Sequence, residues 1–215
     1  MRHFQAHVVL TRILVAAFVL CVACAPFAQA APLIVGGSIF PTPAEPDPVG
    51  GQTVCGPLVA PYSTATFSGT LTSAVIFGDT TNPYGGLTFT YVVSNDASSS
   101  NVNARLSVNG YDGFLTDASY QVPASGVVPT YVDRQLPGDV VGFSFLGMPV
   151  GFGAIEPGQS SSLLVIQTNA TTCSNSFASV IDGAIATIPT YAPAPEPAAL
   201  ALLGLGSLVM IRRRR

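Results

Sequence analysis

The chain has 215 residues, only 9% of them charged, and it contains neither lysine nor tryptophan. Six of its eight arginines lie at the two ends, so the part between them keeps only Arg105 and Arg134 against ten acidic residues. That part therefore carries a formal charge near −8, which argues against nucleic-acid binding because phosphates require a basic surface. The length is sufficient for one domain of ordinary size.

Residues 1–30 have the pattern of a secretory signal peptide. Basic residues come first, the apolar run 13–25 follows, and Ala28 and Ala30 supply small side chains at the two recognition positions. We expect cleavage between Ala30 and Ala31, and hence an exported protein.

Two alternatives for this segment stay open. Cys24 is a candidate lipoprotein site, although Cys21 stands where leucine is usual three residues earlier. The segment can also act as an uncleaved anchor, which the Ala28-Gln29-Ala30 sequence makes the weaker interpretation.

Cys55 and Cys173 are the two cysteines that remain after the signal. Cysteines in an exported chain favour a disulfide, which here would join the start and the end of the domain. The alternative is two separate buried thiols.

Residues 31–61 are expected to form a Pro/Gly-rich arm. Five prolines between Pro41 and Pro57 hinder ladder hydrogen bonds and favour extended, solvated backbone. A short strand is expected only at Leu33 to Val35.

Residues 62–190 read as the folded domain. Apolar and hydroxyl residues alternate from Phe67 to Phe77 and again from Leu87 to Val93, with the turn-rich stretch 80–86 between them. A period of two predicts two half-buried antiparallel strands joined by a loop.

Further strands are predicted along the rest of the domain. The segments are Ala104 to Val108, Tyr120 to Pro123, Tyr131 to Arg134, Val140 to Leu146, Ser162 to Asn169 and Ser176 to Pro189. Leu163 to Ile166 is apolar on both faces, which predicts a central, buried strand. We expect an all-β protein, a single β-sandwich of about seven to nine short antiparallel strands.

The mature chain has no histidine, because His3 and His7 lie in the signal. This removes a Ser-His-Asp triad, a Cys-His dyad and histidine zinc sites, so we expect no enzyme, no metal and no cofactor. The acidic residues Asp96, Asp112, Asp117 and Asp139 are candidates for the carboxylate pair of a glycosidase or for a calcium site. Their setting is typical of ordinary turn chemistry.

The C-terminal end has three parts. The segment 191–197 is a proline-rich linker with Pro195-Glu196-Pro197, residues 198–211 are uncharged and apolar, and Arg212, Arg213, Arg214 and Arg215 close the chain. A helix over 198–211 would be about 21 Å long at about 1.5 Å per residue. This is short for a hydrocarbon core of about 30 Å.

Basic residues beside a span stay on the cytoplasmic side, so we expect a transmembrane helix with its C-terminus inside. The arginine side chains can reach the headgroups and relieve the mismatch in length. The alternative is a buried helix of a globular domain, but such a helix shows one apolar face, and this run is apolar all round.

Pro195-Glu196-Pro197, the apolar run and the arginine cluster together resemble the PEP-CTERM sorting signal of Gram-negative bacteria, also called the ice-binding-protein C-terminal domain. The resemblance covers about a tenth of the chain. It implies cleavage near the motif by an exosortase, an integral-membrane transpeptidase, and it does not imply ice binding.

We therefore expect an exported protein of the cell surface or of the extracellular polysaccharide matrix, with membrane lipid and an exosortase as partners and a non-enzymatic structural or binding role. Two alternatives stay open. The first is a secreted carbohydrate-active hydrolase that uses a carboxylate pair. The second is a carbohydrate- or ice-binding adhesin with a flat, regular Ser/Thr face.

Overall fold

The computed structural model describes residues 32–40, 48, 50–121, 124–146 and 153–194. Within these residues the chain forms eleven strands and no helix, which confirms an all-β domain and exceeds the seven to nine strands predicted. The strands are β1 (Ser38–Ile39), β2 (Gln52–Ser63), β3 (Ser68–Phe77), β4 (Thr88–Asn95), β5 (Arg105–Val108), β6 (Thr116–Tyr120), β7 (Tyr131–Arg134), β8 (Val141–Ser144), β9 (Leu164–Thr168), β10 (Cys173–Asp182) and β11 (Ala184–Pro193).

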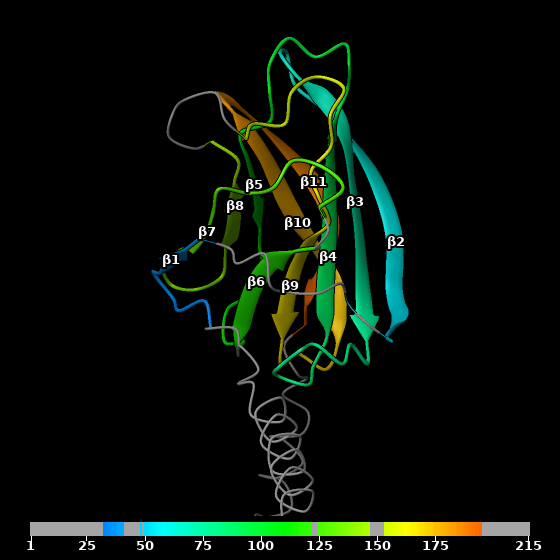
Figure 1. Cartoon of the computed structure of the whole chain (residues 1–215), viewed down its shortest axis with the longest axis vertical. Helices are drawn as coiled ribbons and strands as arrows, with labels where there is room; N and C mark the ends of the chain where they lie inside the picture. The colour runs from blue at the N-terminus through cyan, green and yellow to red at the C-terminus, as the bar shows by residue number, and fades with distance from the viewer. Residues whose placement is uncertain (1–31, 41–47, 49, 122–123, 147–152, 195–215) are drawn as a thin grey trace, which may run out of the picture.

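The strands form two antiparallel sheets in a sandwich-like arrangement (Figure 1). One sheet has the order β1-β7-β8-β5-β10-β11, and the other has the order β2-β3-β4-β9-β6. Every pairing between neighbouring strands is antiparallel.

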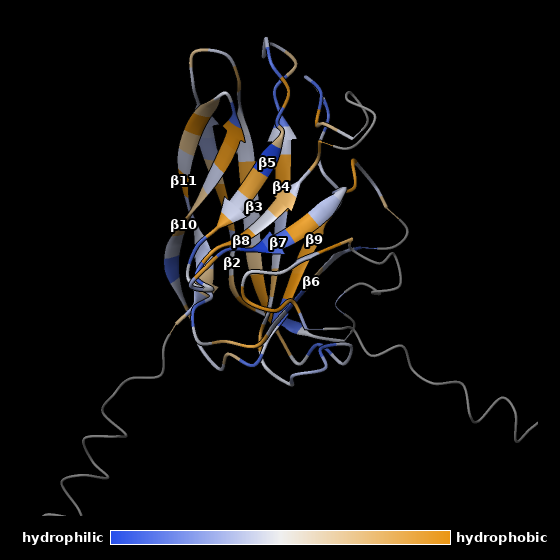
Figure 2. Ribbon diagram, turned by 90° about the vertical axis from the view of Figure 1, so that its left-hand side faces the viewer, coloured by the Kyte–Doolittle hydropathy of each residue, from blue (hydrophilic) through white to orange (hydrophobic). Residues whose placement is uncertain are grey.

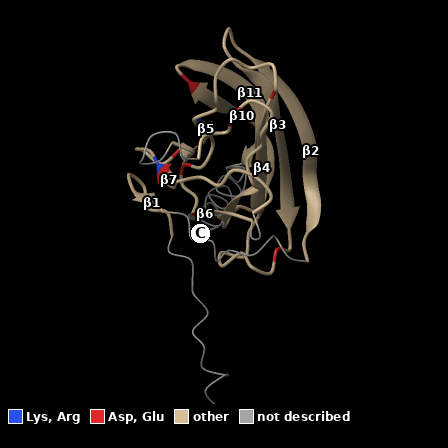
Figure 3. Cartoon of the chain, turned by 45° about the horizontal axis from the view of Figure 1, so that its top comes forward, with Lys and Arg blue, Asp and Glu red and all other residues tan. Residues whose placement is uncertain are grey.

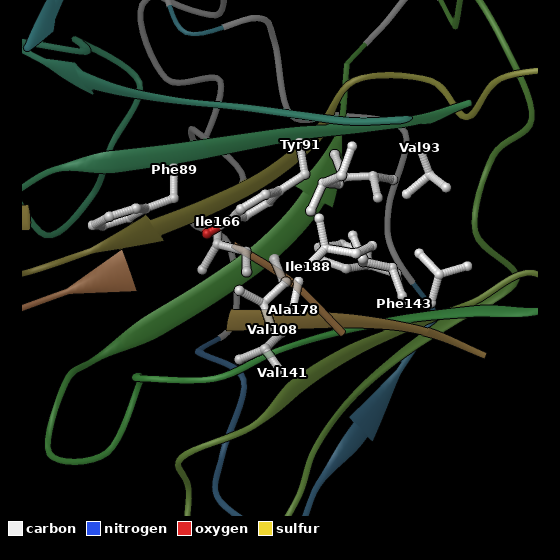
Figure 4. Close-up of a cluster of buried hydrophobic side chains, with 14 of the residues drawn as sticks. Phe89, Tyr91, Val93, Val108, Val141, Phe143, Ile166, Ala178 and Ile188 are labelled. Atoms are coloured by element: carbon white, nitrogen blue, oxygen red, sulfur yellow. The ribbon is translucent and has the colours of Figure 1, made fainter. Parts of the chain in front are cut away.

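One hydrophobic core lies between the two sheets (Figure 4). The second sheet contributes Phe89, Tyr91, Val93 and Ile166, and the first contributes Val108, Val141, Phe143, Ala178 and Ile188. All nine are 1% exposed or less. Each large side chain buried in this way contributes about 1.5–3 kcal/mol, so this interface supplies the main favourable term in folding.

The β3–β4 hairpin confirms the alternation read from the sequence. In β3, Gly69, Leu71, Ser73 and Val75 are buried while the residues between them are partly exposed. The same alternation of apolar and polar positions is visible along the strands in Figure 2. Phe77 differs from the expectation: it continues the inward series, but β3 ends there and its side chain is 59% exposed.

The central position predicted for 163–166 is also confirmed. β9 lies between β4 and β6, and all five of its residues are buried. A strand covered on both faces has no need for polar positions, which explains the apolar run Leu164 to Ile166; the buried Gln167 and Thr168 that follow donate hydrogen bonds to Asp79 and to the Leu87 carbonyl. The neighbouring strand β6 begins earlier than predicted, at Thr116 in place of Tyr120.

The N-terminal region needs two corrections. The short strand is Ser38–Ile39 and not Leu33 to Val35, and Leu33 is instead a buried core residue. β2 begins at Gln52, inside the stretch interpreted as an arm. The prolines in β2 had indicated a solvated arm. They fit a strand because β2 is at the edge of its sheet, and an edge strand tolerates a missing N–H.

The C-terminal region needs a correction of the same kind. The segment predicted as one strand from Ser176 to Pro189 is a hairpin, β10–β11, which turns at Gly183 with φ +67°. Asp182-Gly183 is a hairpin signal that the sequence contained, because glycine adopts this φ without strain. β11 continues to Pro193, so most of the expected linker before Pro195 is strand.

A polar layer lies on the outer face of β4, β9 and β6. Thr88, Gln167 and Asp117 are aligned across the three strands, and each is 4% exposed or less. Asp79, in the loop after β3, accepts hydrogen bonds from the Thr81 hydroxyl (2.6 Å), the Thr88 hydroxyl (2.7 Å) and the Gln167 amide (3.2 Å). This carboxylate fixes the β3–β4 loop on the sheet.

Burial alone would raise the pKa of Asp79, but the hydrogen bonds from Thr81, Thr88 and Gln167 outweigh it and hold the pKa below its usual range. Folding therefore gains stability from the ionised form at any pH above the unfolded pKa of about 3.9. That gain is lost as the pH falls through the lower, folded-state pKa.

We predict that Asp79→Asn lowers the free energy of unfolding by about 1–3 kcal/mol at neutral pH, because buried donors lose a charged acceptor. The difference from the parent should begin to shrink below about pH 4, where Asp79 of the unfolded chain takes up a proton, and should disappear below the lower folded-state pKa. Denaturant unfolding of the detergent-solubilised full chain at pH 7 and pH 3 measures both. Asp182→Asn, at the β10–β11 turn, is the control and should shift stability by less than about 0.5 kcal/mol. A pH-independent loss would contradict the role given to the charge.

Candidate functional site

Both ends of the described domain lie at one end of the two sheets, at the bottom in Figure 1. The strand register aligns Phe77, Thr88, Thr168 and Thr116 along that end of the second sheet, through β3, β4, β9 and β6. The backbone N–H of Leu33 donates to the Thr116 carbonyl (2.8 Å), which places the N-terminal side there. We call this end the terminal pole; it is made of Leu33 and Ile34, Val54, residues 77–86, Leu115, residues 169–172 and Ala194.

The C-terminal side leaves the domain at the same pole. Cys173 pairs with Pro193 across the β10–β11 hairpin. Beyond this pair, the Ala194 N–H donates to the Thr172 carbonyl (3.0 Å), and the Thr172 hydroxyl donates to the Ala194 carbonyl (3.2 Å). The chain is therefore held by the domain up to the residue immediately before Pro195.

A disulfide between Cys55 and Cys173 joins the two sheets beside this exit, as the sequence predicted. Cys55 lies on β2, the edge strand of one sheet, and Cys173 begins β10 of the other. The bond links positions 118 residues apart. It closes the seam between the two sheets at the point where the tail begins.

Two buried tyrosines hold the last residues of β11 from inside. The Tyr91 hydroxyl donates to the Tyr191 carbonyl (2.7 Å) and lies 2.7 Å from the Tyr111 hydroxyl. Because Tyr91 has one proton to donate and a carbonyl only accepts, Tyr111 is the donor in the second bond. Burial raises the pKa of both phenols, so both are neutral throughout the physiological range.

Arg134 holds the N-terminal side at this pole. It is 5% exposed, and its guanidinium donates to the carbonyls of Tyr111 (2.6 Å), Phe114 (3.0 Å) and Gly138 (2.9 Å), with further bonds to Thr116 and Leu33. Burial lowers its pKa, and the charge of Asp112 offsets part of this. The sequence analysis did not assign this role to Arg134, although Arg134 lies two residues after Val132 and therefore on the same, buried face of β7.

The candidate carboxylates are not gathered into one site. Asp96 lies in a loop far along the sheets from the terminal pole and accepts from the Ser68 hydroxyl (2.7 Å). Asp139 accepts from the Gly110 N–H (3.0 Å), next to the turn that contains Asp112. Asp117 is buried on β6, beside Gln167. Figure 3 shows acidic positions in separate parts of the domain.

Two further findings concern only the described part of the chain. It contains no group of three or more His, Cys, Asp or Glu side chains arranged to hold a metal ion. Among the same residues there is no helix with the length and hydropathy needed to cross a membrane.

The sequence-predicted signals lie outside the described residues. These are the cleavage position at Ala28, Ala30 and Ala31, the motif Pro195-Glu196-Pro197 and the cluster Arg212, Arg213, Arg214 and Arg215. The structure therefore places the point from which the tail leaves, at Ala194, and not the tail itself.

Comparison with protein-family models identifies this tail. Residues 193–215 match the model of the PEP-CTERM protein-sorting motif. The chain carries a PEP-CTERM sorting motif. The motif indicates export, a membrane-anchored sorting tail and processing by an exosortase-type enzyme, and its match begins on the last residue of β11. Neither a curated protein nor a solved structure matches the chain in the other two comparisons.

We predict that Tyr91→Phe lowers the free energy of unfolding by about 1–3 kcal/mol, because the Tyr191 carbonyl and the Tyr111 hydroxyl lose a buried partner. Tyr131→Phe, with its side chain at the surface, is the control and should change stability by less than about 0.5 kcal/mol. Denaturant unfolding of the two full-length variants compares them. Equal effects would contradict the role assigned to the Tyr91 hydroxyl.

Removal of the disulfide should lower the free energy of unfolding by more than loss of the Tyr91 hydroxyl does. Cys173→Ser should lower stability by about 4–5 kcal/mol, since the bond closes a loop of more than 100 residues in the unfolded chain. Unfolding of the parent with and without reductant gives an independent measurement. Cys21→Ser, in the signal segment, is the matched control and should leave the exported protein unchanged. A reduced parent as stable as the oxidised one would contradict the prediction.

Proposed function

We propose that this chain is a cell-surface or extracellular-matrix protein of a Gram-negative bacterium, sorted through its C-terminal tail and active without catalysis, in a structural or binding role. In this proposal the two sheets form a single β-sandwich between a signal helix at 1–30 and a transmembrane helix at 198–211. The observation that carries it is the sorting motif that begins where β11 ends.

The order of events follows from the chain. The N-terminal signal directs export, and the apolar run 198–211 stops in the bilayer with Arg212 to Arg215 inside. The domain folds outside the cytoplasm, where an oxidising compartment converts Cys55 and Cys173 to the disulfide. An exosortase then cuts near Pro195-Glu196-Pro197 and releases or reattaches the domain.

A non-enzymatic role is supported by the residues of the mature chain. It has no histidine. Asp79 and Asp117, both beside Gln167, are 6% and 4% exposed. A glycosidase needs two carboxyl groups that both reach the sugar. The oxygens of Asp79 instead accept bonds from Thr81, Thr88 and Gln167.

A binding role would fall to the loops at the opposite end from the tail. These loops are 63–66, 96–101 and 156–159, rich in Ser, Thr, Asn and Gln, and they contact one another. With the terminal pole toward the membrane, they are the part of the domain that meets the surroundings of the cell. Their neutral hydroxyl and amide groups suit extracellular polysaccharide better than a charged polymer.

The sorting step is tested with a matched pair of variants. In a host that contains an exosortase, the parent should yield a mature protein that begins at Ala31 and ends near Pro195 to Pro197, read by mass spectrometry. We predict that Glu196→Ala leaves the full-length chain in the membrane fraction. Glu156→Ala removes the same side chain from an exposed loop and should be processed like the parent. Full-length parent in the cytosol, with both original ends intact, would refute the proposal.

A further inference from the structure

The terminal pole carries an unusual share of exposed apolar side chains. Ile34, Val54, Phe77 and Leu115 are 67%, 51%, 59% and 53% exposed. Leu115 lies beside the turn after β9, where its N–H donates to Asn169 Oδ1 (2.9 Å). Phe77 is the last residue of β3, Val54 lies near the start of β2, and Ile34 follows the anchored Leu33. Single exposed apolar residues are ordinary, but several at one end are not.

The opposite end of the sheets differs in composition. Its loops 63–66, 96–101 and 156–159 contain Ser, Thr, Ala, Asn, Asp, Gln, Glu, Pro and Gly, and none of them holds a large apolar side chain. The exposed apolar residues near that end are Ile185 (65%), just after the β10–β11 turn, and Leu146 (48%) and Tyr131 (38%), beside the end of β8. Exposed apolar side chains occur elsewhere on the domain too, at Phe40, Val59 and Phe177, but those at the terminal pole are the ones beside the points where the chain enters and leaves.

The position of the C-terminal exit limits what can cover this pole. The domain holds the chain up to Ala194, and the apolar run begins at Ala198. Three intervening residues reach at most about 14 Å across the four steps from Ala194 to Ala198, even when fully extended. A tail anchored in the bilayer therefore keeps the terminal pole within about that distance of the interface.

We propose that the terminal pole is a membrane-docking surface, on which Ile34, Val54, Phe77 and Leu115 enter the interfacial layer of the bilayer while the tail is anchored. The inference rests on the proposed function, because it takes the tail as membrane-inserted. Docking fixes the domain upright, with Pro195 to Pro197 at the depth where an integral-membrane processing enzyme works and the polar loops pointing outward.

Charge indicates how the docking occurs. In the described part of the chain neither arginine is available to lipid headgroups: Arg105 pairs with Asp133 (2.5 Å), and Arg134 is buried. Asp112 lies in the turn before Leu115. Apolar insertion, and not attraction to anionic lipid, is therefore the driving force. Added salt or a larger fraction of anionic lipid should not strengthen it.

The absence of tryptophan from the chain provides a direct test. Four single-tryptophan variants of the full chain, Phe77→Trp, Leu115→Trp, Ile185→Trp and Leu205→Trp, are reconstituted in phosphatidylcholine and phosphatidylethanolamine vesicles with brominated acyl chains. The first three replace exposed side chains, so folding is retained. Quenching of each fluorescence by bromine reports contact with the lipid.

Quenching and a blue shift are expected at positions 77 and 115 and in the tail at 205, with neither at 185. One result would overturn the docking proposal: emission at positions 77 and 115 that is as unquenched as at 185, while position 205 is quenched. The anchored tail would then remain intact, and the processing enzyme would be the occupant of the pole. An unquenched reporter at 205 would instead refute tail insertion, and the docking with it. Docking that strengthens with phosphatidylglycerol would overturn the apolar mechanism.

Discussion

The closure of the two sheets at the terminal pole is the constraint on which the rest of the structure depends. The Cys55–Cys173 bond joins an edge strand of one sheet to β10 of the other, and the Tyr91 hydroxyl reaches from the core to the backbone of β11. Together with the Thr172–Ala194 bonds, they hold the chain until the sorting motif begins. A domain fastened this close to its tail cannot move far from the membrane or from the enzyme that cuts it.

The acidic, lysine-free composition has a structural counterpart. Both arginines of the domain serve the fold, since Arg105 lies against Gly142 in its pair with Asp133 and Arg134 is buried among carbonyls. The described surface thus has no free basic group to attract polyanions. Such a surface does not attract polyanions by charge.

The accuracy of the sequence reading followed the strength of the local pattern. The alternation from Phe67 to Phe77 and the two-faced apolar run at 163–166 predicted β3 and a central β9, because burial of one face or both fixes the pattern. β2 was missed because its prolines look like breakers until an edge position is known to accommodate them. The β10–β11 hairpin was predicted as one strand because the turn signal at Asp182-Gly183 was not used. The buried roles of Asp79 and Arg134 were missed, because their partners come from distant segments.

The sequence alone determined that the chain carries a sorting tail: the motif Pro195-Glu196-Pro197, the apolar run and the arginine cluster are contiguous, so a local pattern is sufficient to recognise them. It also determined the class of the fold, because a period of two is local. Only the tertiary structure decided that both ends of the domain share one pole, that the predicted disulfide lies beside it and that exposed apolar side chains lie there. These facts depend on strand order, which pairs residues far apart in the chain and leaves no local pattern to read.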